Sequence, residues 1–132
     1  MFRFARVMLV IAALVEVVFR GIPALFGSPA VARLFNLEYL PGFIPYVHAF
    51  GAVMICLGIL FYVGSKAPEK HLLIMNVAIL RFALGIAAQL GSYFQLGSLH
   101  VFWWIHMAVD VALVVLLIVA RQSVLASHRN AP

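Results

Sequence analysis

Four long apolar stretches constrain the fold of this chain more than any other feature of its sequence. They cover residues 5–26, 46–63, 72–91 and 101–120. Each has about the 17–25 residues that a helix needs to cross the hydrocarbon core of a bilayer, and a helix satisfies its own backbone hydrogen bonds in lipid. Because 66% of the 132 residues are hydrophobic and only 10% are charged, no soluble domain is expected. We therefore predict an all-α, single-domain integral membrane bundle of four transmembrane helices.

The ends of the first stretch need separate interpretation. The N-terminus resembles a signal peptide, but Glu16 interrupts its apolar region, so we interpret it as a retained first helix. In the long loop that follows, Ser28 before Pro29 is typical of a helix start. We predict a short interfacial helix over residues 30–35, with Arg33 facing water.

Basic residues gather on one side of the predicted membrane. If the helices alternate in direction, the side that holds the two termini carries Arg3, Arg6, Lys66, Lys70, Arg121 and Arg129. Only Arg20 and Arg33 fall toward the other side. Because cytoplasmic loops carry an excess of Lys and Arg, we expect a bacterial inner-membrane protein with both termini in the cytoplasm. The net charge of +5 then reflects topology and contact with anionic lipid headgroups, and we expect no nucleic-acid partner.

Charged residues on three different predicted helices share one depth in the membrane. At 1.5 Å per residue, Glu16, Arg81 and Asp110 each lie about 15 to 16 Å from the cytoplasmic end of their helix. Arg20 follows Glu16 by four residues and His106 precedes Asp110 by four, so the members of each pair share a helix face. We expect these faces to point inward.

Two acidic and two basic side chains balance at this depth. An isolated charge at the bilayer centre costs about 2.5–3.5 kcal/mol on insertion scales, so the charges need partners. We expect Arg81, together with His106, to meet Asp110. Two interpretations stay open: a self-neutralised network that fixes the helix register, or a polar site at the base of an outward-opening pocket. The candidate site residues are Glu16, Arg20, His48, Arg81, Trp103, His106 and Asp110.

The residue types bear on metal binding, haem binding and thiol chemistry. A metal held by Glu16, His106 and Asp110 is disfavoured because the nearby arginines would repel a cation. His48 and His106 are of the type that binds haem iron, but we do not expect haem. The lone Cys56 excludes a redox thiol pair. Two polar residues of the third helix, Asn76 and Gln89, are expected to bond between helices.

The chain also resembles a known family. It has a carboxylate in its first helix, a proline-containing outer loop, a glycine-rich second helix, an arginine in "AILRFALG" and a polar fourth helix. Together these features resemble the small DoxX-like bacterial membrane proteins, with the BphX-like group found among aromatic-degradation genes as the nearer match. The resemblance covers nearly the whole chain. It implies an accessory membrane subunit, since some DoxX-type members are associated with quinone or sulfur redox enzymes.

Three classes of function follow from these observations. The leading hypothesis is a protein that binds a quinone-like or lipid-like small molecule, or a partner subunit, beside the polar cluster. The alternative is an intramembrane isomerase or hydrolase, with Asp110 or Glu16 as proton donor and His106 as base. The third is a purely structural, oligomer-forming protein. We expect self-association through a small-residue face of the second helix that contains Gly51, Ala52 and Gly58.

Overall fold

The computed structural model describes residues 2–27, 29–30, 33, 42 and 44–129. Its elements are α1 (Arg3–Leu14), the π-helix η1 (Val15–Gly21), α2 (Ile22–Phe26), α4 (Ile44–Lys66), α5 (Leu72–Leu96) and α6 (Val101–Arg129). No strand occurs in the described residues, so the all-α prediction is confirmed. The short helix predicted over residues 30–35 lies largely outside the described residues.

Four helical spans are long and apolar enough to cross a membrane. They are Arg3–Phe26, Ile44–Lys66, Leu72–Leu96 and Val101–Ser127. Large apolar side chains are exposed along all of them, for example Leu14, Ile59, Leu84 and Ile105. Helices with apolar side chains on their outer faces as well as in the core are typical of membrane spans. The protein is a multi-pass membrane protein, as predicted.

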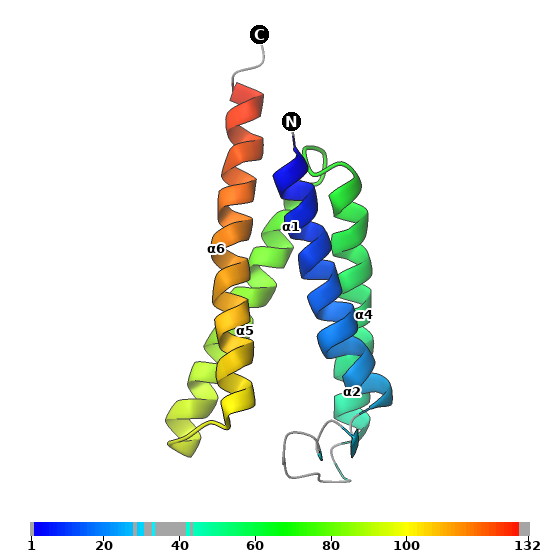
Figure 1. Ribbon diagram of the computed structural model, residues 1–132, viewed down its shortest axis with the longest axis vertical. Helices are drawn as coiled ribbons and strands as arrows, with labels where there is room; N and C mark the ends of the chain where they lie inside the picture. The colour runs from blue at the N-terminus through cyan, green and yellow to red at the C-terminus, as the bar shows by residue number, and fades with distance from the viewer. Residues whose placement is uncertain (1, 28, 31–32, 34–41, 43, 130–132) are drawn as a thin grey trace.

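The four spans form two helix pairs (Figure 1). The first span packs against α4, and α5 packs against α6, while α1 also contacts α6. Both termini lie at one end of the molecule, which we call the terminal end; the turn between α5 and α6 marks the loop end. The two pairs lie close together at the terminal end and diverge toward the loop end.

The hydrophobic core joins the pairs in the half nearer the terminal end. Leu9 of α1, Phe61 of α4, Phe82 of α5 and Leu117 of α6 are all fully buried in it. The rings of Phe61 and Phe82 lie 6.2 Å apart, centroid to centroid. Small side chains on α1, such as the fully buried Ala12, let the helices approach closely. The polar residues of the first span follow directly after this core.

The first span is not the uniform α-helix that the sequence predicts. Residues 15–21 form a π-helix, which includes the buried residues Glu16, Arg20 and Gly21. Pro23 follows within a turn. A proline has no N–H and clashes with the carbonyl four residues earlier, here that of Phe19, so the helix before it distorts. Single π-turns inside α-helices are frequently found at functional sites.

The small-residue face of α4 is used inside the chain. A Cβ added to Gly51 would lie 2.7 Å from the backbone nitrogen of Leu25 and 2.9 Å from the carbonyl oxygen of Gly21. A Cβ added to Gly58 would lie 3.0 Å from the carbonyl oxygen of Ala13. These two glycines therefore let the first span cross α4 at close range. Both glycines face the chain's own first span, whereas Ala52 of the predicted face is exposed, and self-association stays a prediction.

Candidate functional site

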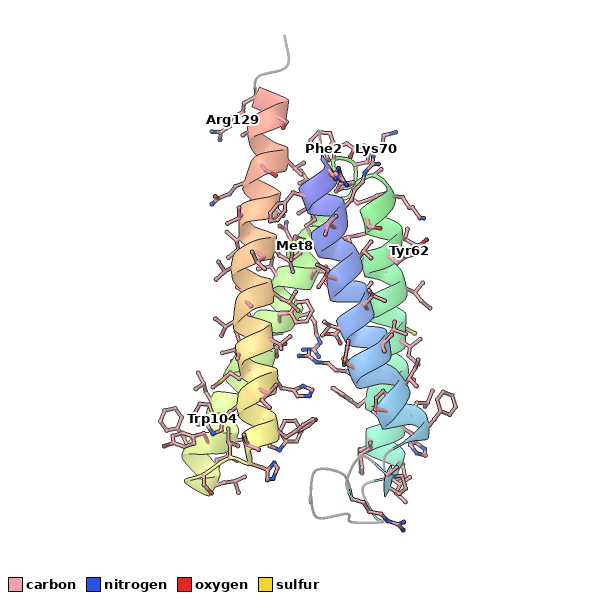
Figure 2. All side chains as sticks on the ribbon, in the orientation of Figure 1. Phe2, Met8, Tyr62, Lys70, Trp104 and Arg129 are labelled. Carbon is pink, nitrogen blue, oxygen red and sulfur yellow. The ribbon has the colours of Figure 1, made fainter. Side chains whose placement is uncertain are left out.

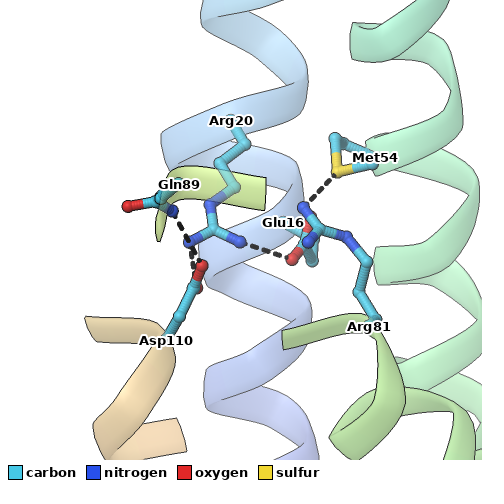
Figure 3. Close-up of polar contacts among 6 residues, drawn as sticks. All are labelled: Glu16, Arg20, Met54, Arg81, Gln89 and Asp110. Atoms are coloured by element: carbon cyan, nitrogen blue, oxygen red, sulfur yellow. Dashed lines mark hydrogen bonds and ion pairs between the residues drawn. The ribbon is translucent and has the colours of Figure 1, made fainter. Parts of the chain in front are cut away.

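A cluster of buried and partly buried polar side chains joins the two helix pairs. We call Glu16, Arg20, Arg81, Gln89 and Asp110 the polar cluster; they come from η1, α5 and α6 and meet between the pairs (Figure 3). Glu16 is fully buried, Asp110 is 1% exposed and Arg20 is 6% exposed. Charged side chains are this deeply buried only when they are paired, so their contacts decide what the cluster can do.

Arg20 bridges the two carboxylates. Its Nη1 donates to Oε1 of Glu16 at 2.9 Å, one helical turn away on the same segment. Its Nη2 donates to Oδ1 of Asp110 on α6. The sequence predicts Arg81 as the partner of Asp110, and this prediction is wrong. Glu16 and Arg20 are both buried residues of η1, and Arg20 reaches across to α6 and takes that place.

Arg81 contacts the carboxylate of Glu16. Its Nη2 lies 3.4 Å from Oε2 of Glu16 and 3.0 Å from the sulfur of Met54 on α4. The Phe82 ring packs beside both guanidinium groups, with its centroid 5.8 Å from Cζ of Arg81 and 5.5 Å from Cζ of Arg20. Sequence reasoning missed Met54 and Phe82, since an apolar residue gives no sign that it will contact a charge.

Gln89 completes the cluster on α5. Its Nε2 donates to Oδ2 of Asp110 at 3.3 Å, which confirms the predicted interhelical bond. Asn76 makes the second predicted interhelical bond, since its Oδ1 accepts a hydrogen bond from Nε of Arg121 on α6 at 2.6 Å.

Gly85 lies on α5 between Arg81 and Gln89. A Cβ there would lie 2.6 Å from Oδ2 of Asp110. The missing side chain therefore makes room for the carboxylate of α6.

Two buried hydrogen-bonding atoms of the cluster have no hydrogen-bond partner among the described residues. They are Nε of Arg81, which can donate, and Oε1 of Gln89, which can accept. A buried polar atom without a partner costs about 1–3 kcal/mol, so such atoms in a native structure call for an explanation. The free donor can bond to a carbonyl group on a ligand, and the free acceptor can bond to a hydroxyl group.

His106 and Trp103 lie one and two helical turns from Asp110 on α6, toward the loop end. His106 is partly buried on α6, and its ring centroid lies 4.3 Å from that of Phe102 and 5.9 Å from that of Trp103. Trp103 is 41% exposed. His48 is exposed on α4, and none of the described side-chain contacts joins it to the cluster. The structure thus brings four of the predicted residues together, sets two beside them and leaves His48 apart.

The charges determine which ligands suit the site. Two guanidinium groups face two carboxylates, so the ion pairs leave no net charge in the cluster. Within the described part of the chain, no group of three His, Cys, Asp or Glu side chains is placed to hold a metal ion. The cluster therefore has no excess charge that could pair with a charged ligand head.

Fold and site together define a class: a small multi-pass membrane protein whose two helix pairs are joined by a buried, charge-balanced polar cluster. No protein-family model matches the sequence, and neither a curated protein nor a solved structure matches it.

Proposed function

We propose that the protein binds a neutral, lipid-soluble small molecule whose polar head reaches the polar cluster, with a quinone as the best-fitting class. The observation that carries the proposal is the pair of unpartnered buried atoms, Nε of Arg81 and Oε1 of Gln89. A quinone carbonyl accepts a hydrogen bond from the first, and the hydroxyl of the reduced quinol donates to the second. Either bond would relieve the cost of a buried, unsatisfied group.

The arrangement of the helices supports entry from the loop end. The first span packs extensively against α4, and α5 against α6. In the described part of the chain, neither η1 nor α2 packs extensively against α5 or α6. Among the described residues, the printed polar contacts between η1 and the second helix pair are those of the polar cluster, Arg20 to Asp110 and Arg81 to Glu16. A hydrophobic tail could remain in lipid while the head enters between the pairs.

Aromatic side chains beside the cluster can pack against the flat ring of a quinone. The rings of Phe102 and His106 contact each other at an interplanar angle of 53°, and Trp103 flanks both of them. Aromatic rings pack well in offset or edge-to-face contact with other rings. His106 can also donate or accept a hydrogen bond near the ligand head. We propose no catalytic step, because no described contact sets His106 against a carboxylate of the cluster.

We further propose that the terminal end faces the cytoplasm of a bacterial cell. Six exposed or partly exposed basic residues lie near that end: Arg3, Arg6, Lys66, Lys70, Arg121 and Arg129. Arg20, which the sequence assigns to the opposite side, is buried in the cluster and does not count toward the bias. The excess of positive charge at the terminal end agrees with the rule for cytoplasmic loops. Membership of the DoxX-like group, self-association and a partner subunit stay predictions.

Fluorescence of Trp103 offers a direct test of ligand binding. The chain has two tryptophans, and Trp104→Phe leaves Trp103, next to His106, as the only one. In this background we expect decylubiquinone to quench the fluorescence saturably. His106→Ala should weaken binding at least about tenfold, and Gln89→Ala about five- to tenfold, the value of one hydrogen bond.

Gln95→Ala is the matched control for Gln89→Ala, since Gln95 is an exposed glutamine near the end of the same helix. It should leave quenching within about twofold of the parent, as expected for a surface side chain outside the site. Equal effects of the two glutamine changes would contradict the proposed site. So would quenching that rises linearly with decylubiquinone, because partition into the micelle gives no saturation.

A further inference from the structure

A second site is suggested by an apolar groove that is separate from the polar cluster. The groove encloses about 270 Å³ between the first span and α4. It is lined by Val10, Leu14 and Val18 on the first span and by Gly58, Ile59 and Tyr62 on α4, among others. Tyr62 points away from α5 and α6 (Figure 2). Leu14 and Ile59 are more than half exposed, so the groove opens to lipid.

Basic side chains lie beyond the groove, toward the terminal end of the molecule. Lys66, one turn beyond Tyr62, donates from Nζ to the Tyr62 hydroxyl at 2.7 Å. Its ammonium group also lies 4.2 Å from the centroid of the Tyr62 ring. These two contacts hold the ammonium group beside Tyr62, which lines the groove. On the first span, Arg6 precedes Val10 by one turn and shares its helix face.

The terminal end of the molecule beside the groove carries an excess of positive charge. Arg3 and Arg6 are exposed at the start of α1, and Lys66 and Lys70 are exposed at the end of α4 and in the turn after it. Glu69 is the single carboxylate in the adjacent turn, and it is partly buried. Phe2 and Lys70 both lie at this end of the molecule (Figure 2). An elongated apolar surface that leads toward basic side chains matches a molecule with an acyl tail and an anionic head.

We propose that this groove binds an anionic phospholipid, with one acyl chain along the groove and the phosphate between Arg6 and Lys66. The hydroxyl of Tyr62 keeps Lys66 in position for the phosphate. Basic residues attract anionic lipid in general, but a defined site adds a tail contact and a preference that depends on two particular cations. The site is independent of the proposed quinone site, because no residue of the polar cluster lines it.

Native mass spectrometry can measure this preference. The purified protein is offered equal amounts of palmitoyl-oleoyl phosphatidylglycerol and phosphatidylcholine in detergent. We expect the wild type to retain mainly phosphatidylglycerol. Arg6→Gln combined with Lys66→Gln should lower the ratio of the two bound lipids about 25-fold, since each basic residue near an anionic lipid contributes about fivefold. Millimolar inorganic phosphate should not displace the lipid.

Matched variants separate a site from general basic charge. Arg121→Gln with Arg129→Gln removes the same charge from α6 and should change the lipid ratio by less than about twofold. Ile59→Trp fills the groove and should reduce the retention of both lipids, whereas Leu80→Trp on the exposed face of α5 should not. An equal loss of preference in the two double variants would overturn the proposal. Unchanged retention in Ile59→Trp, or displacement by phosphate, would overturn it as well.

Discussion

Replacing Arg20 with methionine is expected to destabilise the protein by about 3–5 kcal/mol. The change leaves Glu16 and Asp110 buried with only Arg81 to balance them, and an uncompensated buried charge is costly. The loss should appear as an earlier unfolding transition when the protein in mild micelles is titrated with sodium dodecyl sulfate and followed by circular dichroism. Arg121→Met serves as the control, because Arg121 makes its hydrogen bond at an exposed position.

The effect of Asp110→Asn on stability should have opposite signs in the wild type and in the Arg20→Met protein. In the wild type it removes a partner of Arg20 and leaves one excess positive charge, so it should destabilise. In the Arg20→Met protein it removes the excess negative charge and leaves the Glu16–Arg81 pair, so it should stabilise. The double variant is therefore expected to be more stable than Arg20→Met alone. Additive destabilisation by the two changes would contradict the balance of charge that we describe.

Gly51→Ala is expected to cost about 3 kcal/mol, an effect of overpacking. The three atoms nearest to an added Cβ belong to the backbone, at 2.7 Å, 2.9 Å and 3.1 Å, so no flexible side chain can give way. The first span would have to move away from α4 and would take Arg20 with it. The same detergent titration measures the loss.

Gly91→Ala is the matched control for this change. Gly91 lies within α5, and an added Cβ there meets nothing within 4 Å. Alanine is favoured over glycine inside a helix by about 0.5–1 kcal/mol, so this variant should be as stable as the wild type or slightly more stable. If both glycine changes had the same effect, the close crossing of the first span and α4 would not exist as described.

The sequence predicts the spans and the depth of the charges because both depend on simple periodic rules. Apolar length determines the four helices, and a rise of 1.5 Å per residue brings Glu16, Arg81 and Asp110 to one level. The inward direction of Ala12, Ala13 and Glu16 follows from helix spacing, and all three are buried. The pairing of two acidic with two basic side chains also follows from the sequence, because four unpaired charges could not remain at this depth.

The details of pairing depend on geometry that these rules do not contain. The first span forms a π-helix before Pro23, and Arg20 within it rather than Arg81 meets Asp110, a choice of partner that depth alone does not determine. Proline inside the first apolar stretch was the available signal for this distortion. Whether a glycine faces the chain's own helix or a neighbouring molecule depends on which helices become partners, and one sequence does not define this for Gly51.

A single dipolar coupling tests the central claim, that charges from separate helices meet in the buried cluster. Asp110 is the only aspartate of the chain, so selective ¹³Cγ labelling of aspartate reports on it alone. Solid-state nuclear magnetic resonance of the reconstituted protein, with ¹⁵N in the arginine Nη positions, measures its contact with a guanidinium group. We predict strong coupling that disappears in Arg20→Met and persists in Arg121→Met. Absent coupling in the wild type, or coupling that survives in Arg20→Met, would contradict the account.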